Sequence, residues 1–214
     1  MTTRDLEEWY RNPEAFHHEQ DMVLWTEKLR QCAEALYIIL FENNSQLLGP
    51  VVVSLLQETM NNCPTSVTEI TPALLLKDAA YGVASYVYYE LSNYLSFKVW
   101  FNGALFLELS NEHPNLCIGI IHRKVAVILG FDNFSAGVVK IKDDTKRPVY
   151  CALIRLLQGK DLSVRQACRS LCLHIEDANF SDREFVDLLP ICWDSCFTLF
   201  EEVQEFDSKY LFRF

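Results

Sequence analysis

The stretch Pro148–Ile175, PVYCALIRLLQGKDLSVRQACRSLCLHI, decides the fold class of this 214-residue chain. Apolar residues recur at helical spacing in its first half, and Gly159-Lys160-Asp161 then interrupts the pattern. The pattern resumes from Leu162. An aspartate directly before a helix can accept hydrogen bonds from the free amides of the first turn. The stretch therefore predicts two helices joined by a short turn, with Asp161 at the start of the second helix.

A frame of residue types in the second half of this stretch recurs along the chain. It consists of a basic residue, small residues two and three positions later, and an aliphatic residue six positions later. The basic residues of its four copies, which we assign as structural repeat positions, are Arg30, Lys77, Arg123 and Arg165. Successive copies lie 47, 46 and 42 residues apart. A period of about 40–47 residues that holds two helices is typical of HEAT-type arrays.

This frame has a physical reason. Small residues let a helix approach its partner closely, and aliphatic residues fill the seam between neighbouring repeats. The alternative is that any amphipathic helix places a basic residue near alanine and leucine, but four copies in phase favour a repeat. The turn also resembles the HEAT consensus, in which an aspartate precedes a Val-Arg pair, here Asp161, Val164 and Arg165. We therefore expect Asp161 and Arg165 to be structural, with Arg165 covering the junction between repeats.

The remaining sequence is helical in pattern nearly throughout, with no hairpin signal and no strand–helix alternation. Thr71-Pro72 is typical of an N-cap followed by a first-turn proline, and Pro190 is expected to kink the last helix. A turn at Asn43–Ser45 is expected to separate the first two helices. The predicted helices cover residues 22–41, 47–60, 72–94, 97–109, 120–129, 146–158, 162–176 and 182–204.

These patterns predict one all-α domain over residues 1–214, a HEAT-repeat (armadillo-like), right-handed helical solenoid of about four helix pairs. Its expected parts are an acidic N-terminal segment (1–21), a helix (22–41), repeats (47–94, 97–130 and 145–176), an irregular segment (131–144) and the unpaired first helix of a next repeat (182–204).

Charge and composition limit the class of partner. The chain has 19 Lys and Arg against 29 Asp and Glu, a net charge of −10, which argues against nucleic acid and suits a basic partner. The first twenty residues lack the apolar core of a signal peptide. The longest apolar run, LLGPVVVSLL, is interrupted by Gly49-Pro50 and falls short of the ~18 residues of a membrane span. We expect a soluble, intracellular chain with reduced thiols and no membrane partner.

Two constellations could carry chemistry. The thiols of Cys168, Cys172, Cys192 and Cys196, with His122 and His174, could bind zinc, but their mid-helix positions on apolar stripes favour burial in the core. The tyrosines Tyr81, Tyr86, Tyr88, Tyr89 and Tyr94 could face a cargo or pack between helices, and packing is favoured. We expect no catalytic residues, no metal and no cofactor, because no nucleophile elbow, phosphate loop or dinucleotide fingerprint is present.

Three stretches carry a family resemblance. They are Trp9–Phe41, which opens W-x-x-N-P-E-A-F, Leu74–Glu90 (LLLKDAAYGVASYVYYE), and Asp182–Phe197 (DREFVDLLPICWDSCF). In this order and spacing they resemble repeats of the importin-β (karyopherin-β) family of nuclear transport receptors. The chain looks like an internal fragment or a truncated isoform of such a receptor.

The resemblance implies a function without enzymatic activity. It implies protein import through the nuclear pore, in which the receptor binds protein cargo non-covalently and releases it in a Ran-dependent step. Because the chain is acidic, we expect this cargo to be basic. The resemblance also implies Ran GTPase and nucleoporins as partners. It implies a location in both cytoplasm and nucleus, with shuttling across the nuclear envelope. It assigns no cargo-binding residues. The alternative is a HEAT scaffold subunit of a stable complex, of phosphatase or coat type, without transport activity.

Overall fold

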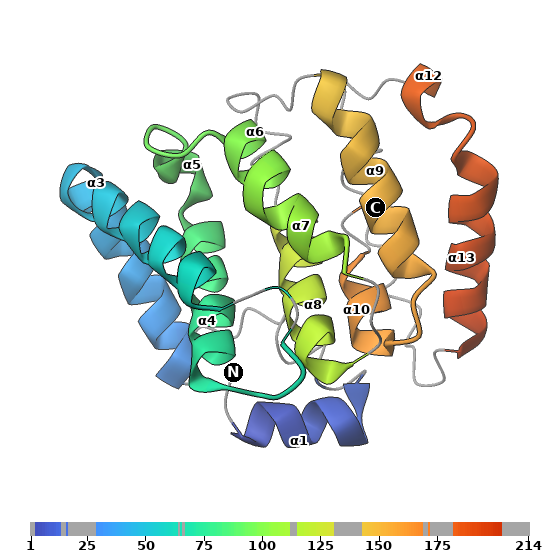
Figure 1. The fold of residues 1–214 in the computed structure, drawn as a ribbon, viewed down its shortest axis with the longest axis horizontal. Helices are drawn as coiled ribbons and strands as arrows, with labels where there is room; N and C mark the ends of the chain where they lie inside the picture. Colours follow the sequence, from blue (N-terminus) through green and yellow to red (C-terminus); the bar gives the residue numbers. More distant parts are fainter. Residues whose placement is uncertain are drawn as a thin grey trace.

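Helices make up every element that the computed structural model describes, as the sequence predicts (Figure 1). The structure describes residues 3–13, 16, 29–63, 65, 67–111, 115–130, 143–168, 171 and 182–202. Figure 1 shows the helices side by side in chain order, from α3 (Leu29–Asn62) at one end to α13 (Leu189–Glu202) at the other. The fold is all-α, a HEAT-repeat helical solenoid.

Three successive helix pairs form most of the described stack. Helix α3 packs on α4, α7 packs on α8, and α9 packs on α10. Because α4 also packs on α8, and α8 on α10, the second helices of the pairs form one continuous layer. The other elements are α1 (Thr3–Arg11), α4 (Pro72–Tyr86), α5 (Tyr88–Leu91), α6 (Phe97–Trp100), the π-helix η1 (Phe101–Leu105), α7 (Phe106–Leu109), α8 (Leu116–Gly130), α9 (Asp143–Leu157), α10 (Leu162–Ala167) and α12 (Asp182–Phe185).

Helix α4 begins as the sequence predicts and ends earlier. The Thr71 hydroxyl oxygen accepts a hydrogen bond from the Leu74 amide at 3.2 Å, and Pro72 occupies the first turn. The helix stops at Tyr86 instead of Tyr94, because Val87 leaves helical geometry (φ −122°, ψ 21°). The short α5 then places the ring of Tyr88 against Trp100, with centroids 6.0 Å apart.

Helix α3 bends where a turn was predicted. Asn44 has non-helical backbone angles (φ −136°, ψ 30°), yet helix continues on both sides of it. The side chains of Asn43 and Asn44 donate to the carbonyls of Ile39 and Leu40, at 2.7 and 2.9 Å, and so compete with the backbone amides. The predicted break between two helices is therefore present, and it takes the form of a kink at Asn44 and not of a loop.

The Gly49-Pro50 pair lies inside α3, within the helix predicted for residues 47–60. By length and composition alone, residues Cys32–Asn62 could cross a membrane. In this structure the helix is bent at Asn44 and packs on α4, as a member of the helical stack.

Other helix ends also differ from the prediction. Helix α8 begins at Leu116 instead of Ile120, because the Asn115 side chain accepts a hydrogen bond from the Ile118 amide at 2.9 Å. Helix α9 begins at Asp143, within the segment predicted to be irregular, and acidic residues favour a first turn. The rest of that segment, residues 131–142, lies outside the described residues, as do the predicted helical residues 22–28, 169, 170, 172–176, 203 and 204.

The last predicted helix is divided in two. Helix α12 ends at Phe185, and α13 begins at Leu189. Pro190 therefore lies in the first turn of a new helix, where its missing amide hydrogen costs nothing, and does not kink a continuous one. Arg147 of α9 donates to both carboxylate oxygens of Asp187 between the two helices, at 2.9 and 2.5 Å.

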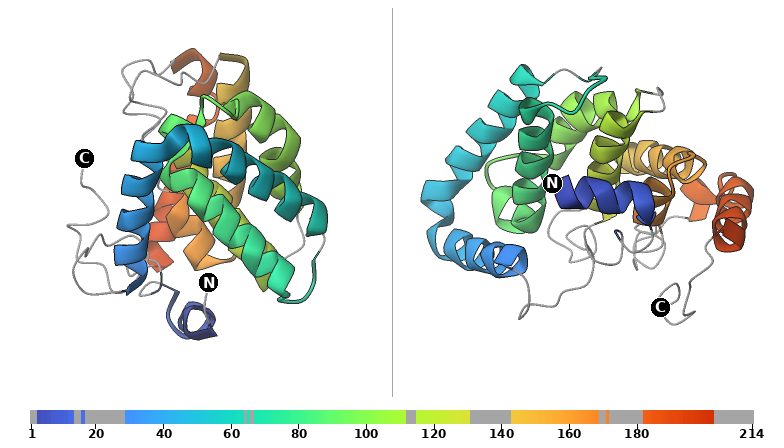
Figure 2. Two further views of the ribbon diagram at one scale, coloured as in Figure 1. Left: turned by 90° about the vertical axis from the view of Figure 1, so that its left-hand side faces the viewer. Right: turned by 90° about the horizontal axis from the view of Figure 1, so that it is seen from below.

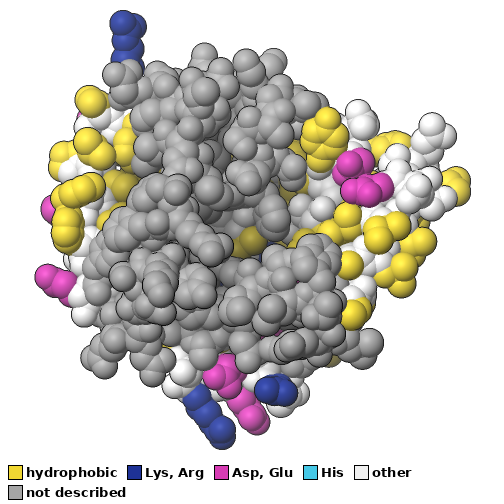
Figure 3. Space-filling model, turned by 180° about the vertical axis from the view of Figure 1, so that it is seen from behind, with side chains coloured by type: hydrophobic (Ala, Val, Ile, Leu, Met, Phe, Trp, Pro, Cys, Tyr) yellow, Lys and Arg dark blue, Asp and Glu magenta, His cyan; other side chains and the backbone are white. Residues whose placement is uncertain are grey.

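The core runs between the two layers, and the two ends of the stack remain apolar at the surface. Viewed from behind, hydrophobic side chains gather over both ends (Figure 3). The exposed apolar residues of α3 and α13 are Leu36, Ile39, Leu40, Leu47, Val51, Leu189, Ile191, Trp193 and Phe197. Monomeric proteins rarely expose large contiguous apolar patches.

Candidate functional site

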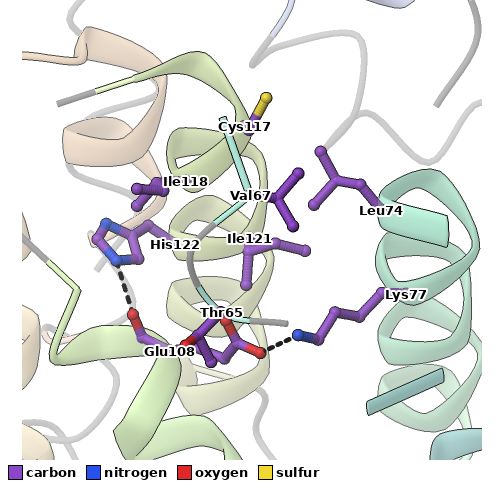
Figure 4. Close-up of a pocket in the computed structure, with 9 residues that line it drawn as sticks. All are labelled: Thr65, Val67, Leu74, Lys77, Glu108, Cys117, Ile118, Ile121 and His122. Atoms are coloured by element: carbon purple, nitrogen blue, oxygen red, sulfur yellow. Dashed lines mark hydrogen bonds and ion pairs between the residues drawn. The ribbon is translucent and has the colours of Figure 1, made fainter. Parts of the chain in front are cut away.

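A buried polar junction joins the first and second helix pairs. Lys77 of α4 is 1% exposed, and Glu108 of α7 is 5% exposed. Their charged groups form an ion pair (Figure 4). The Tyr81 hydroxyl also donates to Glu108 at 3.4 Å. Lys77 Nζ also donates to the carbonyl of Cys63, directly after α3, at 2.9 Å. The ammonium group thereby binds the free carbonyl end of one helix and the carboxylate of the next pair.

A contact between a basic side chain and a carbonyl at a helix end also occurs in the next two pairs, with other side chains. His122 Nε2 lies 3.0 Å from the carbonyl of Glu108, near the end of α7, and Arg165 Nε donates to the carbonyl of Leu157, the last residue of α9, at 3.0 Å. Since a carbonyl only accepts, His122 Nε2 carries the hydrogen. Burial lowers the pKa of His122, so its imidazole is neutral at pH 7.

A small cavity of about 10 Å³ lies beside this junction, lined by Lys77, Glu108 and His122 among others (Figure 4). That volume corresponds to about one water molecule. The junction therefore offers no room for a substrate, and its polar groups serve to join repeats.

The other structural repeat positions have different surroundings. Arg123, which the frame aligned with Lys77, is 5% exposed and lies over the ring of Phe16, 5.1 Å from its centroid. Asp161 Oδ1 accepts from the Val164 amide at 3.1 Å, the N-cap interaction expected from the sequence. The side chain of Arg30 lies outside the described residues.

Helix α1 crosses the end of the stack at which the turns within the repeats lie (Figure 2). Trp9 of α1 is 4% exposed, and its indole Nε1 donates to Asp161 Oδ2 at 3.1 Å. The ring also contacts Phe16, with centroids 5.0 Å apart. Gly119 of α8 makes room here, since a Cβ at this position would lie 3.6 Å from the Trp9 ring and 3.2 Å from Asp161 Oδ2. The contact joins residues 152 positions apart.

An open groove of about 920 Å³ lies beside this contact. Its walls come from α1, from the ends of α7 and α9, and from the starts of α8 and α10. Arg155, Lys160, Trp9 and Tyr10 are among the residues that line it. Sequence analysis did not find this groove, because no local pattern shows that α1 lies against residues 158–161.

The cysteines and tyrosines divide between core and surface. Cys168 and Cys192 are buried, and Cys196 is half-buried. Burial raises the pKa of the Cys168 thiol, and a hydrogen bond with Cys192 lowers that of Cys196 to about 7. Within the described ranges, no three His, Cys, Asp or Glu side chains are placed to hold a metal, and Cys172 and His174 lie outside them.

Of the five tyrosines, Tyr81 and Tyr88 pack in the core, which agrees with the packing interpretation for these two. Tyr81 meets Trp100 edge to face, with centroids 5.9 Å apart, and Tyr86 is half-buried. Tyr89 and Tyr94 are exposed.

Comparison with known proteins identifies the family. No family model matches the chain, and no solved structure matches it significantly. Among curated proteins, human and mouse importin-11 are each 32% identical to it over 211 residues. Importin beta-like protein KAP120 of Saccharomyces cerevisiae is 26% identical over 196 residues.

These alignments cover nearly all of the chain and little of the relatives. They include 98% of the chain for both importin-11 proteins and 86% for KAP120. The chain spans about a fifth of the length of these relatives, 21% and 17% respectively. Together with the stacked helix pairs, this similarity along the whole sequence shows that the chain belongs to the importin-β family.

Proposed function

We propose that the chain is part of a nuclear transport receptor and binds protein cargo non-covalently during import through the nuclear pore. The observation that carries the proposal is the similarity to importin-11 over 98% of the chain. An open stack of helix pairs suits the role, because it presents extended surface to a protein partner. Within this proposal, the repeats occupy residues 47–94, 97–130 and 145–176.

The proposed cargo is basic. The net charge of −10 favours a partner of opposite sign and raises the rate of encounter with it. Ran GTPase and nucleoporins are the other proposed partners, with Ran-dependent release of cargo and shuttling between cytoplasm and nucleus. This part of the proposal follows from membership of the family.

The test is capture of a lysine-rich peptide by the immobilised chain, with the same peptide acetylated on every lysine as control. Because exposed charges are screened over about 8 Å at physiological ionic strength, capture of the lysine-rich form should weaken steeply as salt is raised. The acetylated form should bind weakly at every salt concentration. Equal capture of both forms, or capture that salt leaves unchanged, would exclude basic cargo.

Ran is tested in a second arm with the same complex. Added Ran-GTP should release the captured peptide, and Ran-GDP should not. If neither nucleotide form releases it, this segment binds cargo without being the part that responds to Ran.

A further inference from the structure

The packing positions of the repeating frame, three and six residues after its basic residue, are exposed in the first copy and covered in the other three. In the first copy they are Ala33 and Leu36, and Leu36 is 58% exposed. In the later copies Val83 is half-buried and the other five are at most 2% exposed, namely Ala80, Ala126, Leu129, Cys168 and Leu171. Leu40, one turn after Leu36, is exposed as well. We call Ala33, Leu36 and Leu40 the α3 end face.

Helix α13 exposes an apolar stripe at the other end of the stack (Figure 1). It packs on α9 and α10, and its buried residues include Cys192 and Leu199. The exposed stripe, which we call the α13 end face, has a spacing of four residues and consists of Leu189, Trp193 and Phe197. The rings of Trp193 and Phe197 meet edge to face, with centroids 5.1 Å apart. In α9 a stripe of the same spacing is buried in the core, and it consists of Val149, Leu153 and Leu157.

The two end faces belong to the two kinds of helix that form a pair in this stack. The segment of α3 before Asn44 carries the repeating frame, as the second helices α4, α8 and α10 do. Helix α13 follows α10 in the chain and packs on the first helix α9, so it lies in the layer of first helices. Helix α13 of one copy and residues 29–42 of another therefore offer the two sides of a contact between first and second helices that the fold already contains.

Charge at the helix ends fits the same contact. In the first pair, Lys77 near the start of the second helix donates to the carbonyl of Cys63, directly after the first helix. Arg30 holds the corresponding position of the frame, at the start of α3. Helix α13 ends with Glu201-Glu202. Antiparallel packing of α13 on residues 29–42 of a second copy brings this acidic helix end to a basic helix start, and the free carbonyls of a helix end also favour a cation.

We propose that the chain associates head to tail with a second copy of itself, the α13 end face of one copy packing on the α3 end face of the next. The inference stands apart from the proposed function and rests on the exposed faces and charges of this chain. Because the two faces lie at opposite ends of the stack (Figure 1), each copy can bind two neighbours, and the association is heterologous and open-ended. This arrangement is favoured over packing of like faces, because only it joins an acidic helix end to a basic helix start.

The experiment measures the mass of the chain by sedimentation velocity and light scattering as its concentration is raised. The test variants are Leu36→Glu on the α3 end face and Trp193→Glu on the α13 end face. The control is Val99→Glu on α6, which changes the net charge equally at an exposed apolar residue outside both faces. Circular dichroism verifies that all three variants keep their helix content.

The mass of the wild type should rise with concentration beyond that of a dimer. Each test variant should raise the Kd of association by at least about tenfold, because the contact loses one large buried apolar side chain and gains a charge. Val99→Glu should leave the Kd within about twofold. Because each test variant keeps one intact face, an equimolar mixture of the two should form a 1:1 complex that grows no further.

Four results would overturn the inference. A wild type that stays monomeric would show that the end faces receive another protein. A test variant that still forms dimers alone would show that like faces pack together. An equal effect of Val99→Glu would show unspecific association, and a mixture that stays monomeric would show that the two faces do not pack on each other. Failure to capture basic cargo would leave the inference standing, because the two experiments measure different contacts.

Discussion

Lys77, His122 and Arg165 perform one task with three kinds of side chain. Each lies on the second helix of a pair and donates to a carbonyl at the end of the preceding first helix. The pairs Lys77–Cys63 and His122–Glu108 have the same sequence separation of 14 residues. The repeating basic frame predicted the positions Lys77 and Arg165, but in the middle pair it pointed to Arg123, one residue after the histidine that makes the contact.

The sequence could not distinguish His122 from Arg123. Both are basic types in adjacent positions, and the frame selects by residue type. What separates them is the direction of the side chain, because Arg123 lies over Phe16 of the N-terminal segment. That segment is distant in sequence and leaves no mark on the local pattern.

A first prediction concerns the Lys77–Glu108 pair, which is almost fully buried. Lys77→Met should lower the free energy of unfolding by about 3–5 kcal/mol, because it leaves the carboxylate of Glu108 buried without its partner. The double variant Lys77→Met/Glu108→Leu should recover most of this loss, since no buried charge remains. Urea denaturation followed by circular dichroism measures both.

The matched control is Lys160→Met in the exposed turn between α9 and α10, which should change stability by less than about 0.5 kcal/mol. A double variant no more stable than Lys77→Met would show that lost packing, and not the unpaired charge, dominates.

A second prediction follows from the lowered pKa of His122. The unfolded chain takes up a proton on this histidine near its ordinary pKa of about 6.5, whereas the folded chain resists protonation to lower pH. Stability from this group is therefore complete above about pH 6.5 and declines as the pH falls below it. His122→Gln should flatten this part of the profile of unfolding free energy against pH. Parallel profiles for the variant and the wild type would contradict the assignment.

At the scale of elements, predictable features are those that local chemistry decides. Thr71-Pro72 and Asp161 cap their helices as expected, because an N-cap needs only a side-chain oxygen near its own first turn. Asn115 caps α8 by the same kind of hydrogen bond, but the apolar pattern there is weaker and did not predict this early helix start. The end of α4 at Val87 depends on aromatic packing with a later helix, which the sequence pattern of α4 does not contain.

A third prediction tests the attachment of α1. Asp161→Ala removes the N-cap of α10 and the acceptor of the Trp9 indole, so it should lower the free energy of unfolding by about 2 kcal/mol or more. Trp9→Phe should cost less in the Asp161→Ala background than in the wild type, because the hydrogen bond is then already absent.

Asp194→Ala, an exposed aspartate of α13, is the control and should be nearly neutral. Full additivity of Asp161→Ala and Trp9→Phe would show that the two side chains are not coupled.

At the scale of the whole molecule, the repeat period was sufficient to predict the all-α solenoid. The path of the N-terminal segment was not predictable, since α1 returns to residues 158–161 through a contact across 152 positions. The groove exists only because of this return, so neither its lining nor its charge could be read from the repeat frame.

Binding of phenylalanine–glycine repeats of nucleoporins tests the proposed function most directly. A segment of a transport receptor should bind immobilised repeats and lose that binding when their phenylalanines are replaced by serine. If the folded chain does not bind the repeats, or binds the serine form equally, a role in transport is contradicted and the chain is better described as a static helical scaffold.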